Sequence, residues 1–355
     1  MKIRKIYILH HSYHVNRYTW EKEIEEIKSV KPDLILCLCL EEFDYSYIYG
    51  LFFDGIAEWV NDNNTPVKVL VSSPDKVELY PNIYTESTCG YYAWFEDCLN
   101  KPIPTSDMPT DKVFTCYNNN NKFERAVLVD ELARRNLLQH GVVTWKFPDI
   151  DQMGFEYRGS RKFQGWKYHD GSRLVDEEDF ELNSSEKYFA GAYPNSYFRG
   201  FFDLVTESVC YPEQFFCTEK TAKSINALKP FICLANPLYH TKYLVEEYGL
   251  ELYDELFDYD FDKIHDLDKR IHALVDNVER IAQVYSEQYK DNMLQTIHSK
   301  MVRNKQKLTD YGKSKENIVP KSFEFLFNNA VPYTTYGHTH YLQQYIDYYI
   351  SKGWL

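Results

Sequence analysis

The sequence predicts an α/β protein of two Rossmann-like domains, and three observations lead to this prediction. The chain has 355 residues, which exceeds one typical core and suits two domains of ~100–200 residues each. Short apolar runs rich in Val, Ile and Leu alternate with segments of helical spacing, as in proteins with parallel sheets. Hydrophobic residues make up 44% of the chain, so a substantial core can be buried along its length.

Residues 1–105 are predicted to form the first domain. Three apolar runs predict parallel strands, and two segments with apolar residues at helical spacing predict the helices between them. In chain order these elements are the strand Ile3–Leu9, the helix Thr19–Val30, the strand Leu34–Leu40, the helix Tyr45–Val60 and the strand Val67–Val71. Right-handed crossovers would join them into one sheet, and Pro102-Ile103-Pro104 is the expected linker.

Residues 106–330 are predicted to form the second domain, by the same alternation. Its elements are the strand Lys112–Cys116, the helix Phe123–Leu138 closed by Gly141, the strand Val142–Trp145, a strand ending at Val205–Glu207, the helix Glu219–Leu228, the strand Pro230–Ala235, the helix Leu238–Tyr248 stopped by Gly249, and a helical array over 263–310. Residues 149–200 are expected to be irregular. In the segment 331–355, a last helix at Tyr341–Ser351 is expected to pack back on the first domain.

Charge and cysteine usage exclude several classes of protein. A net charge of −13 and a pI near 5.4 disfavour a nucleic-acid partner, which requires clustered Lys and Arg. None of the eight cysteines forms a C-x-x-C pair, so zinc-ribbon and thioredoxin motifs are absent from the sequence. Cysteines within apolar runs, such as Cys37 and Cys39, are typical of reduced core thiols.

The sequence also predicts where the protein works. The first apolar run is too short for a signal peptide, and no segment reaches the length of a membrane span. We therefore expect a soluble, cytoplasmic protein. Heavy use of Tyr, Asn, Lys and Ile is typical of AT-rich genomes, including viral ones, and a viral protein would then act in the host cytoplasm.

The segment Thr218-Glu219-Lys220-Thr221 carries the main functional signal. A capping Thr and a helix start follow a strand there, so unpaired backbone N–H groups are expected to point above the sheet and to favour an anion. A Lys in the first helical turn opposes the helix dipole unless an anion is bound nearby. The alternative, an ordinary surface helix with a capping Thr, explains these residues equally well.

A wider stretch resembles a known donor-binding motif. The residues Glu207-Ser208, Phe216 to Lys223 and Pro230-Phe231-Ile232 resemble the motif of the α-1,3-fucosyltransferases and of fucosyltransferase-like viral glycosyltransferases. The likeness covers 112–262 and is strongest over 205–235, whereas the first domain shows none. It implies the GT-B fold of two facing Rossmann-like domains and a GDP-sugar donor as co-substrate, without a further cofactor.

The resemblance also implies residue roles. Glu219 would contact the ribose, Lys220 the diphosphate, and Arg125, which follows the Asn-rich loop beginning at Asn118, would reach the phosphates. Thr218 and Glu207 complete the nucleotide site. The family often has Glu-Asn-Ser where this chain has Glu207-Ser208, which affects the expected nucleobase contacts. Without the resemblance, Arg125 is explained as a solvated helix residue beside Glu124.

Two patterns suggest metals, and neither supports a metal site here. D-x-D spacing occurs at Asp149-Ile150-Asp151 and in Asp258 to Asp262, but this short motif is expected by chance among 53 acidic residues. The second cluster precedes a helix whose N-terminus it would stabilise. Gly337-His338-Thr339-His340 has ligand-like spacing without a nearby Cys or carboxylate, and we interpret it as a turn.

The acceptor site is expected at the carboxyl ends of the first strands, where open parallel sheets bind ligands. The candidates for the general base that deprotonates the acceptor are His10, His11, Glu41, Glu42 and Asp44. Each could equally be a structural residue at a strand end.

Together these features predict a metal-independent glycosyltransferase. It would move a sugar from a nucleotide-sugar donor to a hydroxyl of a glycan or small-molecule acceptor. Two alternatives remain: a viral glycosyltransferase that modifies DNA bases, which would need a basic cleft, and a non-catalytic module that binds nucleotide sugars or glycans. Product formation from a sugar nucleotide would exclude the second alternative.

Overall fold

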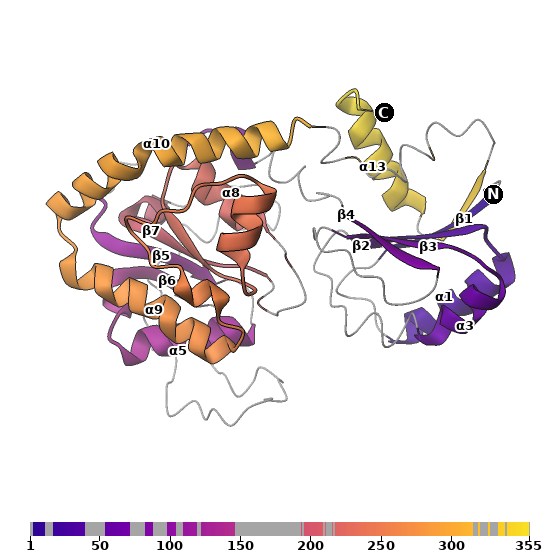
Figure 1. The fold of residues 1–355 in the computed structure, drawn as a ribbon, viewed down its shortest axis with the longest axis horizontal. Helices are drawn as coiled ribbons and strands as arrows, with labels where there is room; N and C mark the ends of the chain where they lie inside the picture. The colour runs from indigo at the N-terminus through magenta and orange to yellow at the C-terminus, as the bar shows by residue number, and fades with distance from the viewer. Residues whose placement is uncertain are drawn as a thin grey trace. The chain divides into compact units, whose positions relative to one another are not determined.

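The computed structural model divides into two compact units. Unit 1 comprises Met1–Ala93, Glu213–Phe216 and Asp310–Leu355, and unit 2 comprises Trp94–Pro212 and Cys217–Thr309. The structure describes residues 3–10, 17–39, 54–71, 82–87, 98–103, 109–118, 122–145, 193, 195–208, 210, 215, 217–314, 319, 326, 333–337 and 339–354. Each unit contains one parallel sheet (Figure 1).

The sheet of unit 1 has five parallel strands in the order β4-β3-β2-β1-β9. Their bounds are Lys5–His10 for β1, Leu34–Cys39 for β2, Val67–Val71 for β3, Ile83–Ser87 for β4 and Thr334–Gly337 for β9. The strands β1, β2 and β3 confirm the three predicted apolar runs. Strand β4 was not predicted.

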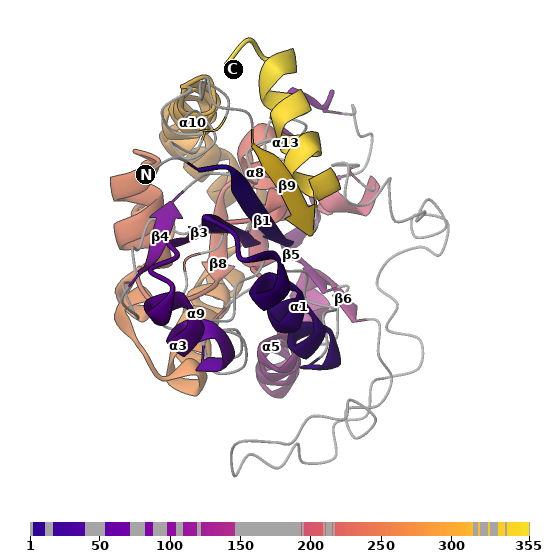
Figure 2. The same cartoon turned by 90° about the vertical axis from the view of Figure 1, so that its right-hand side faces the viewer.

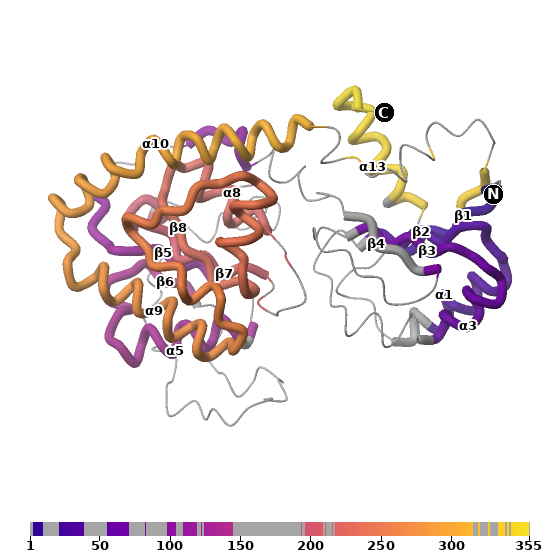
Figure 3. Tube along the Cα trace, viewed as in Figure 1, coloured from indigo at the N-terminus to yellow at the C-terminus, as the bar shows by residue number. Residues whose placement is uncertain are grey.

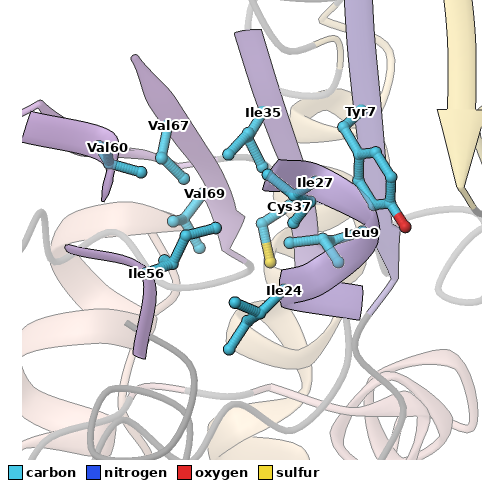
Figure 4. Close-up of a cluster of buried hydrophobic side chains, with 10 residues drawn as sticks. All are labelled: Tyr7, Leu9, Ile24, Ile27, Ile35, Cys37, Ile56, Val60, Val67 and Val69. Carbon is cyan, nitrogen blue, oxygen red and sulfur yellow. The ribbon is translucent and has the colours of Figure 1, made fainter. Parts of the chain in front are cut away.

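Helices α1 (Arg17–Val30) and α3 (Asp54–Asp62) cover one face of this sheet (Figure 1). Their apolar residues, including Ile24, Ile27 and Ile56, meet the strand residues Tyr7 and Cys37 in one buried cluster (Figure 4). The described part of the predicted helix Tyr45–Val60 falls within α3. Helical spacing in the sequence thus located both covering helices.

Strand β9 returns from the C-terminal part of the chain to pair with β1 (Figure 2). Its last residue, Gly337, has a φ of 73° and lies so close to β1 that an added Cβ would be 2.4 Å from the carbonyl oxygen of Ile8. Helix α13 (Thr339–Ser351) follows and lies over the face opposite α1. The four residues of β9, Thr-Thr-Tyr-Gly, form no apolar run, and the sequence indicated only a turn and a helix here.

The sheet of unit 2 has four parallel strands in the order β6-β5-β7-β8. Their bounds are Lys112–Asn118 for β5, Gly141–Trp145 for β6, Gly200–Thr206 for β7 and Phe231–Leu234 for β8. Every residue of β7 and β8 is buried, as expected for strands covered on both faces. Both units are therefore α/β with Rossmann-like parallel sheets.

Helices cover both faces of this second sheet (Figures 1 and 3). Helices α5 (Phe123–Arg134) and α9 (Leu267–Val284) lie on one side, and α8 (Glu219–Asn226) and α10 (Glu287–Tyr311) on the other. A π-helix at Tyr239–Glu247 follows β8 and is stopped by Gly249 at a φ of 66°, as the sequence predicted.

The predicted role of Gly141 was wrong. Helix α5 ends at Arg134, and Asn136 takes the left-handed conformation with a φ of 56°. Gly141 is instead the extended first residue of β6, with a φ of −121°. Its missing side chain makes room for a neighbouring ring, because a Cβ there would lie 2.4 Å from the ring of Phe114.

A buried ion pair lies inside unit 2. Asp203 of β7 accepts hydrogen bonds from Thr115, Tyr197 and Ser224, and the ammonium of Lys229 is 2.6 Å from its carboxylate. Burial lowers the pKa of Lys229, whereas the charge of Asp203 acts in the opposite direction. Each oxygen of the carboxylate has donors, which satisfies a charge that would otherwise be costly to bury.

The cysteines and helices bear on the remaining sequence predictions. Six of the eight cysteines are buried thiols, namely Cys37, Cys98, Cys116, Cys210, Cys217 and Cys233. Burial raises the pKa of Cys116 to about 12, so this thiol stays protonated at neutral pH. Among the helices that the structure describes, none is long and apolar enough to cross a membrane.

Candidate functional site

The candidate site lies where the direction of strand order reverses in unit 2. From β5 the chain passes through α5 to β6 on one side, and later through β7 and α8 to β8 on the other. The connections after β5 and β7 therefore lead to opposite faces of the sheet, and the crevice that such a switch point implies lies at the carboxyl ends of these two strands. Open α/β sheets bind their ligands at such a point.

Glu207, directly after β7, holds the start of α8. Its side chain is fully buried, and Oε1 accepts hydrogen bonds from the hydroxyls of Thr221 at 2.6 Å and Tyr239 at 2.9 Å, and from the backbone N–H of Thr218 at 3.3 Å. Oε2 accepts from the hydroxyl of Thr218 at 2.5 Å. Four donors thus compensate the burial of this carboxylate and fix the first turn of α8 above the sheet.

Thr218 is the N-cap of α8, as the sequence predicted. Its Oγ1 accepts a hydrogen bond from the backbone N–H of Lys220 at 3.3 Å and another from the Lys220 ammonium at 3.1 Å. The same ammonium donates to Oγ of Ser208 at 3.4 Å and lies 3.1 Å from the carboxylate of Glu219. Lys220 is therefore folded back over the helix N-terminus toward the end of β7.

Glu219 is a nearly buried carboxylate beside two cations. Only 8% of the residue is exposed. Burial acts to raise the pKa of Glu219, but the charge and hydrogen bond of Lys220 and the charge of Lys223 outweigh it, so the pKa is lowered. Glu219 is thus held as an anion whose oxygens can accept hydrogen bonds from a ligand's hydroxyl groups.

The β5 side of the crevice supplies Asn118 and Arg125. Oδ1 of Asn118 accepts from the hydroxyl of Thr206 at 2.9 Å, and this bond ties the ends of β5 and β7 together. The guanidinium of Arg125, in the first turn of α5, donates to the carbonyl oxygen of Thr206 at 3.4 Å. Arg125 is only 2% exposed, so it is a buried cation beneath the crevice and not a solvated helix residue.

Two further basic residues hold the loop that follows β7. The ammonium of Lys122, the N-cap residue of α5, donates to the carbonyl oxygen of Ser208 at 2.6 Å. Arg270 reaches from α9 and donates to the carbonyl oxygen of Cys210 at 2.6 Å. Ser208 and Cys210 are thus held by two basic residues from the face of the sheet that α5 and α9 cover.

The structure brings together the six predicted site residues of unit 2. Asn118, Arg125, Glu207, Thr218, Glu219 and Lys220 all surround the carboxyl end of β7. In unit 1, His10 is the last residue of β1 and pairs in register with Leu38. The other base candidates, His11, Glu41, Glu42 and Asp44, lie outside the described residues.

Of the two D-x-D patterns, the structure describes only the second. Asp149 and Asp151 lie outside the described residues. Asp262 is buried, and its carboxylate accepts from the backbone N–H groups of His240 and Thr241, at 3.1 and 2.8 Å, and from the His240 ring at 2.9 Å. It therefore stabilises the N-terminus of the π-helix, a different helix from the long one expected. Within the described ranges no three potential ligands form a metal-binding group.

Sequence reasoning missed three residues of the site. Lys122 and Arg270 lie outside the motif that carried the resemblance, and Tyr239 was part of an unremarkable helix start. The only sequence signal for Lys122 was its place directly before α5, at the end of the Asn-rich loop. The contacts of Tyr239 and Arg270 depend on chain separations of 32 and 60 residues, which no local pattern encodes.

The assembled geometry gathers basic side chains at the topological switch point of a Rossmann-like α/β unit. Three basic side chains, Lys122, Arg125 and Lys220, bond to the carboxyl end of β7 and the loop after it, in a protein whose net charge is −13. The N-termini of α5 and α8 adjoin the same point. Comparison of the chain with protein-family models, curated proteins and solved structures finds no match.

Proposed function

We propose that this chain is a glycosyltransferase that binds a nucleotide sugar at the carboxyl end of β7. The observation that carries the proposal is the gathering of Lys122, Arg125 and Lys220 there, with Glu219 beside them. Basic side chains and helix N-termini suit a diphosphate, and a carboxylate suits the two hydroxyls of a ribose. The resemblance of Arg125, Glu219 and Lys220 to the fucosyltransferase motif supports a GDP-sugar donor and the GT-B fold.

The proposed reaction uses these groups to stabilise the leaving diphosphate. The hydroxyl oxygen of a glycan or small acceptor attacks C1 of the sugar, while the bond between C1 and the β-phosphate oxygen breaks and its electron pair stays with the diphosphate. Lys220 neutralises the charge that develops on that oxygen. The acceptor's proton passes to a base, for which His10, His11, Glu41, Glu42 and Asp44 stay predictions. Neutralisation by basic side chains makes the proposed reaction metal-independent.

The nucleotide is identified first, by thermal shift with GDP-, UDP- and CMP-sugars. A ligand present at 100 times its Kd stabilises the protein by about 2.7 kcal/mol, which is a readily measured shift for a unit of this size. A GDP-sugar is expected to give the largest shift. Turnover of that donor is then followed with a panel of hydroxyl acceptors, and the absence of any product would favour the non-catalytic binding module.

The role of Lys220 is tested by Lys220→Ala. This variant is expected to lose nearly all transfer while its circular dichroism spectrum stays that of the wild type, because Thr218 still caps α8. Lys263→Ala is the matched control, since that lysine forms an exposed pair with Asp260 in the same unit and should leave turnover unchanged. Near-normal turnover of Lys220→Ala would overturn the site assignment.

A further inference from the structure

Two lysines from opposite faces of the second sheet share one partner residue. Lys122, before α5, donates to the carbonyl oxygen of Ser208 at 2.6 Å, and Lys220, in the first turn of α8, donates to Oγ of Ser208 at 3.4 Å. Ser208, Lys122 and Lys220 are each only partly buried. Two ammonium groups thus stand on either side of a single, solvent-accessible serine at the mouth of the crevice.

Helix stability alone gives no reason for this placement. A cation at a helix N-terminus is unfavourable, and both lysines occupy such a position. Lys122 is the N-cap residue of α5, and its ammonium, which has no acceptor atom, cannot cap that helix. The two ammonium groups also repel each other and Arg125. The carboxylate of Glu219, 3.1 Å from the Lys220 ammonium, offsets part of this repulsion, and an anion bound between the two lysines would turn the rest into attraction.

We propose that Lys122 is a direct ligand of the diphosphate, opposite Lys220. The inference rests on the proposed nucleotide-sugar site and assigns Lys122, one of the basic residues gathered there, a direct contact with phosphate. Each lysine exchanges its hydrogen bond to Ser208 for a phosphoryl oxygen, so that one phosphate is held from the α5 side and the other from the α8 side.

Lys122 and Arg125 also differ in burial. Arg125 is 2% exposed and bonds to Thr206 beneath the crevice, whereas Lys122 is partly exposed at its rim. The ammonium of Lys122, on a flexible side chain at the rim, can move with the ligand, whereas the buried guanidinium of Arg125 acts as a fixed charge below it. Lys122 and Arg125, at the start of α5, therefore differ in function, and Lys122 is the one that contacts phosphate.

The test measures binding of inorganic pyrophosphate and orthophosphate by titration calorimetry, without assuming a nucleobase or an acceptor. Loss of one charge-assisted hydrogen bond predicts that Lys122→Met weakens pyrophosphate binding roughly ten-fold to a hundred-fold. Binding of orthophosphate, which one lysine can hold alone, should weaken far less. The affinity of the variant for pyrophosphate should also fall less steeply with rising salt, because one charge is missing.

Lys112→Met is the matched control. Lys112 lies at the opposite end of β5 and donates to a backbone carbonyl, that of Gln139 at 3.0 Å, as Lys122 does to Ser208. It should bind pyrophosphate as the wild type does. Lys122→Arg keeps the charge and should retain most of the affinity, which separates loss of a ligand from loss of local structure.

The outcomes distinguish this inference from the proposed function. If sugar transfer depends on Lys220 but pyrophosphate affinity is unchanged in Lys122→Met, the assignment of Lys122 is wrong and the function stands. If pyrophosphate binding depends on both lysines but no sugar nucleotide is turned over, Lys122 is an anion ligand and the transferase proposal fails. A wild-type protein that binds no pyrophosphate overturns the inference.

Discussion

The carboxylate of Glu207 offers a sharp test of how the site is held. Its Oε1 accepts from Thr221, Tyr239 and the backbone of Thr218, and its Oε2 accepts from the Thr218 hydroxyl. In Glu207→Gln, the amide oxygen can keep the three bonds at Oε1. The amide nitrogen then faces the Thr218 hydroxyl, whose oxygen already accepts two hydrogen bonds from Lys220.

The expected cost follows from that single mismatch. The Thr218 hydroxyl loses its acceptor in a buried place, and a buried polar group without a partner costs about 1–3 kcal/mol. Weakening the N-cap of α8 also lowers the stability, by about 1 kcal/mol. We therefore expect Glu207→Gln to lower the free energy of unfolding by about 2 kcal/mol, or to lower the Tm by roughly 4–8 °C for a unit of this size.

A double-variant cycle isolates the contact between the two residues. Thr218→Val removes the hydroxyl and keeps the side-chain shape, so it should cost about 1–2 kcal/mol in the wild type. In the Glu207→Gln background the same change should cost about 1 kcal/mol less, because the hydroxyl has already lost its acceptor. Urea unfolding followed by circular dichroism gives the energies, and hydrogen exchange of the α8 amides shows where protection is lost.

Two results would refute this reasoning. Additive energies for Glu207→Gln and Thr218→Val would show that the two side chains act independently. A cost of Glu207→Gln below about 0.5 kcal/mol, which is typical of surface substitutions, would show that the carboxylate is not buried against these donors. Thr218→Ser, which keeps the hydroxyl, serves as the control and should change the stability far less than Thr218→Val.

Two further predictions concern stability outside the crevice. Burial acts to raise the pKa of Asp262, but the His240 ring and Thr241 outweigh burial, so the pKa is lowered. The ionised carboxylate therefore contributes its full stabilisation above about pH 5, and this stabilisation is lost as the pH falls through about 4 toward the lowered pKa. Asp262→Asn should therefore lower the urea midpoint of unfolding at pH 7 and differ less from the wild type at pH 3. A difference in midpoint that does not change with pH would contradict this. Gly337→Ala should lower the stability of unit 1 by about 3 kcal/mol, since its φ of 73° is left-handed and a Cβ would clash with β1. Gly353→Ala, at a φ of 69° with open space around it, should cost only about 1 kcal/mol, and equal Tm shifts for the two variants would show that the clash is absent.

The local sequence determined most of the strands and helices. Continuous apolar runs such as Leu34–Cys39 located the central strands, because a strand covered on both faces must be apolar at every position. Thr218 and Gly249 marked a helix start and a helix end correctly, since capping depends on the chemistry of one or two residues. The same local rules failed at Gly141, where contact with the ring of Phe114 decided the role of the glycine.

Only the tertiary structure decided which distant residues meet. The order β6-β5-β7-β8 places the end of β7 beside that of β5, and this neighbourhood joins Lys122 to Ser208 across 86 residues of sequence. The pairing of β9 with β1 spans more than 320 residues, and the strand itself has only four residues. Local patterns report how a segment buries its own side chains. They carry no record of which strand becomes its neighbour. The sequence therefore predicted the helix start capped by Thr218, but not that Lys122 and Lys220 would both bond to Ser208.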